Sequence, residues 1–210
     1  MTIDPHDVQL VGPRLRLREH CADDLGVYQR IFTDPGLTRY LGTDSMSARA
    51  AADSFDATLL SRSERPRRKY TLAITAPGAD AMIGTIGLLV EEFGSNAMIG
   101  GLVVVPEAGL RGGGVEAGRL MLAFAFGPLG KHRVWAGRRH DHPVMDAVMS
   151  GAGLQPEARL RQLYRTQGQW HDVCTYAALQ PEWAATATAA ERRILASRPG
   201  AARECAAAAR

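Results

Sequence analysis

A glycine-rich segment is the part of this sequence whose residue types and spacing best suit chemistry. Gly109-Leu110-Arg111-Gly112-Gly113-Gly114 follows a mostly apolar run, residues 98–105, that ends in three valines. An amphipathic helix is expected after it, because apolar residues recur at helical spacing: Ala117, Leu120, Met121, Phe124 and Ala125. The first turn of a helix carries unpaired N–H groups and a partial positive charge, and glycines let a phosphate approach closely. With Arg111 able to add a charge-assisted bond, the segment predicts a site for a phosphate-bearing ligand.

Three ligand classes compete for this segment. A Walker loop ends in Gly-Lys-Ser/Thr, whereas Val115-Glu116-Ala117 stands at that place here. The letters Gly112-x-Gly114-x-x-Ala117 match a dinucleotide loop, and Arg138 and Arg139 could hold a 2′-phosphate, so an NADP-binding protein is one alternative. Coenzyme A is the third ligand. A purely connecting role is disfavoured, because three consecutive glycines weaken a helix start.

Hydrophobic periodicity predicts the strands and helices that must position this segment. The expected strands are Val8–Arg18, Tyr70–Thr75, Met82–Val90, Met98–Val105, His132–Arg138 and two that bracket Gln167-Gly168, the second being Trp170–Leu179. The expected helices run from Asp23 or Asp24 to a stop at Pro35-Gly36, from Ser45 or Ser47 to Arg62, along the apolar face after the glycines, and over Asp141–Ser150. The helix after the glycines joins two strands, which requires a parallel pair. A mixed sheet with helices on both faces follows, and too little chain remains for a doubly wound dinucleotide fold.

Composition and charge limit the class of protein. The chain has 210 residues, which suits one domain, and 46% of them are hydrophobic. A net charge of +3 suits a phosphate-bearing ligand but is too small to indicate nucleic acid. No apolar run is long enough to span a membrane, and residues 1–7 do not resemble a signal peptide. Cys21, Cys174 and Cys205 are widely spaced and odd in number, which favours a reducing cytoplasm and indicates neither a disulfide framework nor a metal site.

Six short motifs occur in order along the chain at natural spacing. They are Leu15-Arg16-Leu17-Arg18, Ile83-Gly84-Thr85-Ile86-Gly87-Leu88, Pro106-Glu107 with the later Gly112-Gly113-Gly114-Val115-Glu116-Ala117, Lys131-His132-Arg133-Val134, Gly168-Gln169-Trp170-His171-Asp172-Val173 with Tyr176, and Pro181-Glu182-Trp183. Through them, about Val8 to Trp183 resembles the GNAT superfamily of acyl-CoA-dependent N-acyltransferases, in particular the branch of ribosomal-protein N-terminal acetyltransferases.

The resemblance implies a fold and a domain organisation. The expected fold is α/β, of the α+β type: a mixed, mostly antiparallel sheet of six to seven strands, with helices on both faces and a splayed central parallel pair. Residues 1–183 are expected to form a single acyltransferase domain. Residues 184–210 are rich in Ala and Arg and poor in large apolar residues, which predicts a partly disordered tail outside the core.

The resemblance also implies a reaction and a cofactor site. An acetyl group passes from acetyl-CoA to a primary amine of a small molecule or of a peptide or protein N-terminus, by direct attack on the thioester. The pantetheine arm would run along Val103, Val104 and Val105, one of whose backbone N–H groups would polarise the thioester carbonyl. The remaining cofactor contacts would come from Leu110, Arg111, Gly112, Gly113, Gly114, Val115, His142 and Met145.

The catalytic side chains are less clearly marked. The resemblance points to Tyr176 and Tyr164, although a core tyrosine with a satisfied hydroxyl explains Tyr176 equally well. The family's asparagine is replaced by His142, its tyrosine near the sulfur by Met149, and its acid on the fourth strand by Met98 and Ile99. A cofactor-binding module without catalysis is therefore a second alternative.

For the other polar residues, a structural role is favoured over a catalytic or metal-binding one. Glu91 and Glu92 could line the acceptor site, but a solvated loop is favoured. His140-Asp141-His142 could form a metal or acid–base cluster, but a loop and helix cap is favoured, with no metal. Cys174 is expected in the core and Asp172 in the hairpin. The closing hairpin could support a homodimer, as is common in the family.

Overall fold

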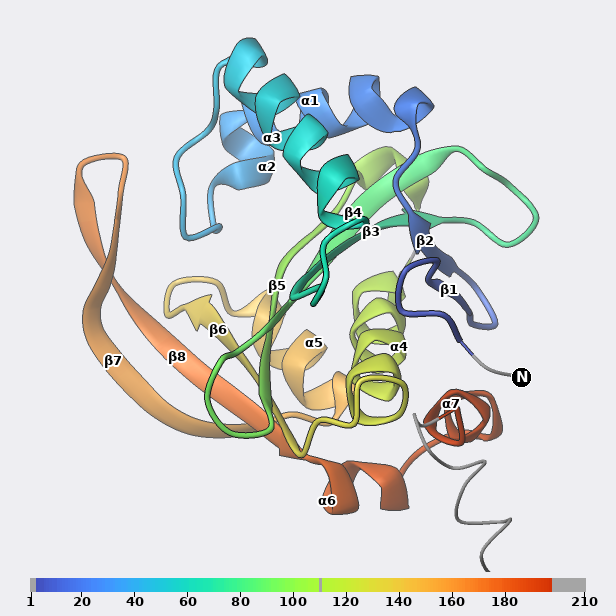
Figure 1. Cartoon of the computed structure of the whole chain (residues 1–210). Coiled ribbons are helices and arrows are strands. Elements are labelled where there is room, and N and C mark those ends of the chain that lie inside the picture. The colour runs from blue at the N-terminus through green and yellow to red at the C-terminus, as the bar shows by residue number, and fades with distance from the viewer. Residues whose placement is uncertain (1–2, 110, 198–210) are drawn as a thin grey trace, which may run out of the picture.

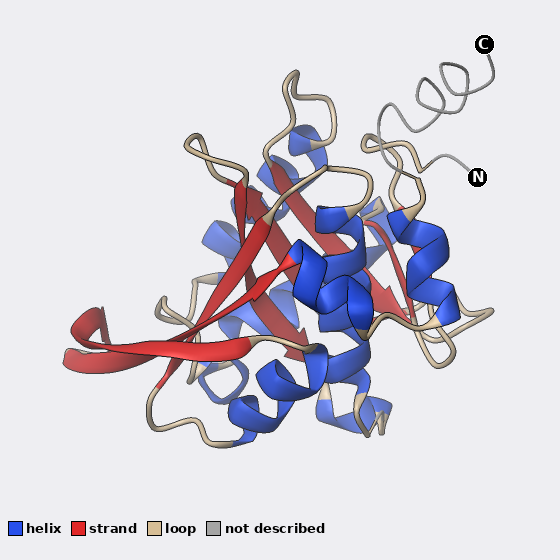
Figure 2. Ribbon diagram, turned by 90° about the horizontal axis from the view of Figure 1, so that it is seen from below, coloured by secondary structure: helices blue, strands red, loops and turns tan. Residues whose placement is uncertain are grey.

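A mixed sheet organises the molecule in this computed structural model, which describes residues 3–109 and 111–197 (Figures 1 and 2). Within the described residues the sheet has eight strands: β1 Gln9–Val11, β2 Arg16–Glu19, β3 Lys69–Thr75, β4 Met82–Val90, β5 Asn96–Val104, β6 Arg133–Arg139, β7 Gln155–Thr166 and β8 Gln169–Leu179. Their order is β1-β2-β3-β4-β5-β6-β8-β7, and β5–β6 is the parallel pair among otherwise antiparallel neighbours. The expected mixed sheet is confirmed, but the expected count of six to seven strands is wrong.

The extra strand comes from the first expected strand, Val8–Arg18, which is a hairpin. Gly12 turns the chain, and its amide donates to the Leu15 carbonyl at 2.9 Å. Leu10 then pairs with Leu17 across the two strands. On one continuous strand Leu10 and Leu15 would face opposite sides, since their separation is odd. The hairpin turns both into the core, where each is at most 1% exposed.

Helices cover both faces of the sheet, as expected. On one face α1 Leu25–Thr33, the short α2 Pro35–Thr38 and α3 Ala48–Ser61 pack as a group. On the other, α4 Gly113–Phe126 and α5 Val144–Ala152 pack against the strands, and Figure 1 shows the two groups separated by the sheet. Pro35-Gly36 ends the first helix as expected but also begins α2, because the Asp34 carboxylate accepts from the Gly36 amide at 2.6 Å.

The central parallel pair opens part of the way along its length. β5 and β6 are in register from Asn96↔Arg133 to Ile99↔Ala136. Beyond that point β5 continues to Val104 beside β4, and β6 continues to Arg139 beside β8. The two strands therefore diverge, which confirms the expected splay and leaves backbone groups of β5 without a strand partner on one side.

A bulge in β5 lies at the start of the splay. Gly87 pairs with Gly100 and Thr85 with Val103, so Gly101 and Leu102 stand opposite Ile86 alone. Gly101 has φ +61°, a left-handed conformation that glycine adopts without strain. The bulge resets which backbone groups of the following residues face the splay.

The last two strands form a long hairpin at the edge of the sheet. Gln167 and Gly168 both have positive φ, +50° and +75°, as a two-residue hairpin turn requires. β7 has one neighbour, β8, and nearly all of its side chains are exposed. Figure 1 shows the hairpin at the left edge of the sheet, and at its turn the Gln167 amide donates to Asp44, between α2 and α3, at 2.6 Å.

The chain after β8 is folded further than expected. α6 Gln180–Ala185 leads to α7 Ala189–Leu195, which packs on α4. Glu191 of α7 forms a buried ion pair with Arg119 at 2.6 Å, and Ile194 is 7% exposed. The prediction of a tail outside the core is therefore wrong for α7. Residues 198–210 lie outside the described residues.

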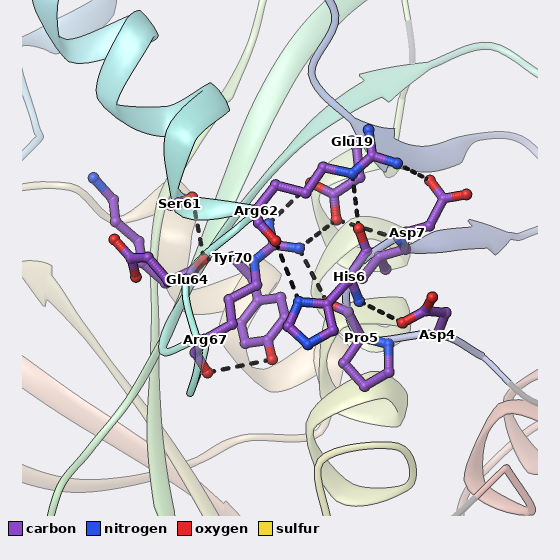
Figure 3. Close-up of polar contacts among 12 residues, drawn as sticks. Asp4, Pro5, His6, Asp7, Glu19, Ser61, Arg62, Glu64, Arg67 and Tyr70 are labelled. Atoms are coloured by element: carbon purple, nitrogen blue, oxygen red, sulfur yellow. Dashed lines mark hydrogen bonds and ion pairs between the residues drawn. The ribbon is translucent and has the colours of Figure 1, made fainter.

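An ion-pair cluster ties the N-terminal segment to the sheet (Figure 3). Arg67 and Glu19 form a bidentate pair at 2.7 and 2.9 Å, and Arg67 also donates to the Pro5 carbonyl at 3.0 Å. Arg62 donates to the His6 carbonyl at 2.7 Å and to Asp7 at 2.6 Å. These groups satisfy one another's charges and hydrogen bonds, which indicates a structural role in holding the N-terminal segment.

No helix among the described residues is both long and apolar enough to cross a membrane.

Candidate active site

A cavity of about 270 Å³ lies where β5 and β6 diverge. One wall is the end of β5 and another is the end of β6; α4, α5 and α2 close the remaining sides. The lining includes Gly100, Gly101, Leu102, Val103, Val104, Gly114, Ala136, Gly137, Arg138, His142, Met145 and Met149. The splay that the resemblance implied thus coincides with a cavity lined by several predicted cofactor contacts.

The backbone of β5 presents its polar groups to this cavity in alternation. The Val105 amide donates to the Ile83 carbonyl of β4 at 2.9 Å. Backbone groups alternate along a strand, so the N–H groups of Val104 and Leu102 point away from β4, toward the splay. Val103 and Val105 bury their side chains against α1 and α3. Of the three predicted valines, Val104 is the one whose N–H faces the splay, and Leu102 was missed.

The glycine-rich turn leads into α4 as predicted. Gly112 has φ +76° and stands just before the helix, which begins at Gly113. The first amides of α4, at Gly113, Gly114 and Val115, therefore point out of the helix start toward any ligand there. Arg111 is exposed beside them. Leu110, the remaining predicted contact of the turn, lies outside the described residues.

A second cation, Arg14, stands at the same helix start. Its Nε donates to Glu116 at 2.8 Å, and its Nη1 donates to the Arg111 carbonyl at 2.9 Å. A Cβ added to Gly112 would lie 3.2 Å from Nη1, so the guanidinium closely flanks the turn. Glu116 is buried in the first turn of α4 and also accepts from the Arg14 and Leu15 amides. No sequence pattern marked Arg14, which lies 97 residues before Arg111 in the chain.

His142 lines the cavity and stacks on Tyr40. The two rings are 3.9 Å apart and 10° from parallel. Burial, helped by the nearby Arg138 charge, lowers the pKa of His142 below its ordinary value of 6.5. The ring is therefore neutral at pH 7 and offers a flat, uncharged surface. Tyr40 also lines the cavity, from the loop after α2, and sequence patterns did not mark it.

Arg138 and Arg139 are both occupied by neighbouring carboxylates. Arg138 pairs with Asp146 of α5, and Arg139 with Asp141 at 2.6 Å. Both arginines are under 10% exposed. Neither guanidinium is free for a 2′-phosphate, and the largely antiparallel sheet is not a dinucleotide fold. The NADP interpretation is therefore wrong.

The two predicted catalytic tyrosines lie behind the cavity lining. Tyr176 is 5% exposed, and its hydroxyl bonds to the Asp146 carboxylate that also holds Arg138. Burial and this bond raise the pKa of Tyr176, and the same bond leads the causes that lower the pKa of Asp146. Tyr164 lies against Gly42 and near Gly137. Neither tyrosine is among the residues that line the cavity.

A second cavity, of about 400 Å³, lies on the α1–α3 side of the bulge. It shares Leu41, Gly100 and Gly101 with the first, so the two cavities meet where β5 bulges. The rest of its lining includes Tyr28, Phe32, Met46, Ser54, Lys69, Thr71, Thr85, Leu88 and Met98. No acidic residue is among its described lining residues, and Lys69 is the charged one.

The remaining polar candidates occupy structural positions. Glu91 accepts from the Trp135 indole at 2.7 Å, and Glu92 pairs with Arg68. The Asp172 carboxylate accepts from the Gln162 amide at 2.9 Å and so fixes the hairpin, as expected. Cys174 is half-buried, packs against the core and lies 3.5 Å from His140 Nδ1. Among the described residues, no group of three or more His, Cys, Asp or Glu could hold a metal ion.

Comparison with protein families gives one match over most of the chain. Residues 14–155 match the family model described as an acetyltransferase (GNAT) domain. No curated protein sequence matches the chain.

Comparison with solved structures gives many similar folds. RimJ of Mycobacterium smegmatis, in complex with CoA-disulfide, has a TM-score of 0.72 at 21% identity, and the match covers 89% of this chain and 93% of the RimJ chain. Spermidine N-acetyltransferase of Vibrio cholerae, in complex with CoA and spermine, has a TM-score of 0.72 at 15% identity, covering 82% of this chain and 99% of its own. A GNAT-family acetyltransferase of Bacillus anthracis has a TM-score of 0.71 at 19% identity, covering 83% and 100%. At these identities the likeness concerns the fold.

Proposed function

The chain belongs to the GNAT family of acyl-CoA-dependent N-acetyltransferases, and from that premise we propose that it acetylates a primary amine carried on an uncharged, apolar group. The amine belongs to a small molecule or to the N-terminus of a peptide or protein. The observation that carries the proposal is the meeting of two cavities at the β5 bulge, the second of them without an acidic lining residue. A polycationic amine would find no carboxylate there to pair its additional charges.

Acetyl-CoA occupies the first cavity in this proposal. Its pyrophosphate lies at the start of α4, held by the amides of Gly112–Val115 and by the cations Arg111 and Arg14. Its pantetheine arm extends the splayed side of β5 along Val103–Val105, where the Leu102 and Val104 amides are free of β4. His142 and Met145 pack on the arm from the other wall, which their place in the cavity lining supports.

The amine approaches from the second cavity. It reaches the thioester beside Gly100 and Gly101, where the absence of side chains lets both substrates come close. A backbone N–H of the splayed strand donates to the thioester oxygen as negative charge develops there, a contribution of about 3 kcal/mol to lowering the barrier. The amine nitrogen bonds to the acetyl carbon, the C–S bond breaks, and the thiolate of coenzyme A leaves.

Tyr176 and Tyr164 act in this proposal by positioning other groups. The Tyr176 hydroxyl and Arg138 share the Asp146 carboxylate, which fixes Arg138 in the wall of the cofactor cavity. Gly42 lines the second cavity, which we call the acceptor cavity because the amine is proposed to bind there. The Tyr164 ring supports Gly42, since a Cβ added to Gly42 would lie 3.3 Å from the ring.

An assay of thiol release from acetyl-CoA tests the proposed function. The acceptors are phenethylamine, a peptide with an apolar N-terminal residue, and spermidine at the same concentration. Release is expected with one or both apolar acceptors and at least tenfold more slowly with spermidine. Faster release with spermidine would overturn the apolar acceptor. Tight coenzyme A binding with no release from any amine would instead support the non-catalytic cofactor-binding module.

We further propose that the protein forms a homodimer through the β7–β8 hairpin. β7 is an edge strand whose second side has no strand partner within the described residues. Leu160, Leu163 and Trp170 on the hairpin are each more than 40% exposed. An exposed edge carrying apolar side chains is suited to pairing with a second copy.

A cytoplasmic location completes the proposal, and the free thiols of Cys21 and Cys174 support it.

A further inference from the structure

A buried histidine lies beside the acceptor cavity and has no part in the mechanism above. The His20 side chain is 1% exposed, and that of Asp24, four residues on in the chain, is 3% exposed. His20 Nδ1 lies 3.3 Å from Asp24 Oδ2, within ion-pair distance, and makes no hydrogen bond of good geometry within the described residues. The rings of Tyr28 and Phe55 meet the imidazole edge-on at 5.7 Å, which fixes its plane.

Asp24 is held as a carboxylate. Although burial opposes its ionisation, hydrogen bonds from Arg18 and the Cys21 amide, together with the nearby His20, keep the pKa of Asp24 well below its usual range. The Arg18 guanidinium binds it in bidentate fashion at 2.7 and 2.8 Å. A permanently ionised carboxylate beside Nδ1 favours a proton on that nitrogen, which leaves the Nε2 lone pair directed away from Asp24.

The other nitrogen of His20 faces a hydroxyl group of the acceptor cavity. Nε2 lies 3.4 Å from Thr85 Oγ1, and Thr85 is among the lining residues of that cavity. Thr85 also pairs with Val103 across β4 and β5, next to the bulge where the two cavities meet. The Leu72 carbonyl, 3.2 Å from Thr85 Oγ1, is the alternative acceptor for the hydroxyl proton.

We propose that Asp24, His20 and Thr85 form a relay that removes the proton from the acceptor ammonium. The inference rests on the proposed function and names the base that the sequence did not reveal. Thr85 is the group that meets the ammonium, His20 receives the proton through Thr85, and Asp24 positions and stabilises the imidazolium. The arrangement suits acceptors that are ionised at neutral pH, because an amine must lose a proton before it can attack.

Protons and bonds balance along this path. The ammonium gives a proton to Thr85 Oγ1 while the Thr85 hydroxyl proton passes to His20 Nε2. The neutral amine forms its bond to the acetyl carbon, the C–S bond breaks, and the coenzyme A thiolate takes up the second proton lost by the nitrogen. After the product leaves, the imidazolium returns its proton through Thr85 to the solvent that refills the cavity. No oxidant, reductant or metal ion is needed.

The charges around His20 agree with this role. Asp24 is the carboxylate in direct contact, and its Oδ2 is shared by Arg18 Nη1 at 2.7 Å and His20 Nδ1 at 3.3 Å, so the Arg18 charge near the imidazole is balanced by Asp24. On α1, the Tyr28 hydroxyl is bound to Ser54 of α3 at 3.1 Å. Phe55 of α3 and Thr85 of β4 complete the immediate surroundings without charge.

Two acceptors that carry the same apolar group distinguish a defect in proton removal from a defect in folding. Phenethylamine is ionised at neutral pH, whereas 2,2-difluoro-2-phenylethylamine has a far more acidic ammonium and is mostly neutral. The variants are His20→Gln, Thr85→Val and Thr85→Ser. Thr58→Val is the packing control, because Thr58 is another buried threonine of the same side, outside the relay. Coenzyme A binding by thermal shift checks that each variant is folded.

A base-relay role predicts an amine-dependent loss. His20→Gln and Thr85→Val should lower kcat/KM for phenethylamine at pH 7 by at least 50-fold and for the difluoro analogue by less than threefold. Thr85→Ser, which retains the hydroxyl, should stay near the wild type, as should Thr58→Val. In the first two variants the pH profile for phenethylamine should keep rising into alkaline pH.

The opposite pattern would overturn the relay. The relay would be refuted by equal losses of kcat/KM with both amines in Thr85→Val, or by no loss of kcat/KM in either His20→Gln or Thr85→Val. If His20→Gln fails to fold, the Thr85→Val and Thr85→Ser pair decides alone. A wild type that acetylates neither amine and no other amine tested would count against the proposed function itself, which is a different outcome from a wild type active with both.

Discussion

Single side chains set the charge at the two ends of the proposed cofactor cavity. Arg111 supplies positive charge at the start of α4, where the helix dipole has the same sign, and Arg14, paired with Glu116 but half exposed, adds a second guanidinium beside it. Farther along, His142 is kept neutral by burial and stacks on Tyr40. A cationic end and an uncharged end match a ligand with phosphates at one end and a thioester at the other.

Removal of one exposed cation tests the phosphate end. Arg111→Ala should raise KM for acetyl-CoA about tenfold with little change in kcat, because a charge-assisted bond to a phosphate contributes to binding and not to the reacting atoms. Arg49→Ala, on the exposed side of α3, is the matched control and should not change KM. Steady-state kinetics with varied acetyl-CoA measures both; an unchanged KM in Arg111→Ala would place the pyrophosphate elsewhere.

The buried carboxylate of Asp24 predicts a pH dependence of stability. Its pKa in the folded protein is below that of the unfolded chain, so its stabilising contribution is complete above about pH 4 and is lost as the pH falls further. Asp24→Asn should therefore be less stable at pH 7, by about 3 kcal/mol, and should lose less stability on acidification than the wild type.

Urea unfolding between pH 2.5 and 7 measures this effect. Asp23→Asn, at the exposed neighbouring position, is the control and should follow the wild-type profile. Parallel stability profiles for Asp24→Asn and the wild type would contradict the stabilising role of the ionised carboxylate.

At the scale of elements, the β5 bulge joins the two cavities. Gly101 turns β5 with φ +61°, and Gly100 and Gly101 line both cavities. In the proposed function, the strand is therefore the wall at which acceptor and cofactor meet. Its regular pairing with β4 on one side and its freedom on the other depend on this local conformation.

A pair of glycine substitutions separates backbone strain from function. Gly101 and Gly78 have φ +61° and +74°, and no atom lies within 4 Å of an added Cβ at either position. Alanine should cost about 1–2 kcal/mol of folding free energy at each. Gly101→Ala alone should also lower kcat/KM at least tenfold, since the strained bulge would re-aim the Leu102 and Val104 amides. Equal activity of the two variants would exclude this role for the bulge.

The β7–β8 hairpin carries the prediction for assembly. Trp170→Ser should convert the dimer to a monomer, or weaken it at least tenfold, because the exposed indole would lose its contact with the second copy. Phe93→Ser, which removes another exposed aromatic ring from the β4–β5 turn, is the control. Light scattering over a concentration series measures the mass; a wild-type monomer at high concentration would refute the dimer.

At the scale of the whole molecule, the C-terminal helices complete the core under α4. Arg119 of α4 reaches across to Glu191 of α7, and Trp183 of α6 packs beside Phe126 with ring centroids 5.6 Å apart. The helix whose first turn is proposed to bind the cofactor is thus held from its far side by the last described part of the chain.

A cavity substitution in α7 tests this support. Ile194→Ala should lower the free energy of unfolding by about 3 kcal/mol, because Ile194 is 7% exposed and packs into the main core. Leu60→Ala, at a position that is 69% exposed, should change it by less than about 0.5 kcal/mol. Chemical denaturation measures both, and equal stability of the two variants would mean that α7 does not stabilise the core.

Local patterns were enough for most of the elements. Alternation and helical spacing predicted the strands β3 to β6 and the helices α1 and α3 to α5, because each pattern reflects which face of one element is buried. They failed at Val8–Arg18, where the turn at Gly12 was overlooked, and at α7. There the core contacts are Ala187, just before the helix, and Ile194 within it, and the Thr188-x-x-Glu191 capping box was the missed signal.

The sequence by itself was enough to predict the proposed cofactor end of the protein. Local sequence patterns were enough to recognise the valine strand, the glycine turn and the helix after it, because these segments are adjacent in the chain. Six spaced motifs identified the family. Tertiary structure alone decided the rest. Arg14 reaches the glycine turn from the first hairpin, Tyr40 stacks on His142, and His20 meets Thr85 across two elements. These contacts join residues 65 to 102 positions apart, and no local periodicity encodes which distant side chains a folded sheet brings together.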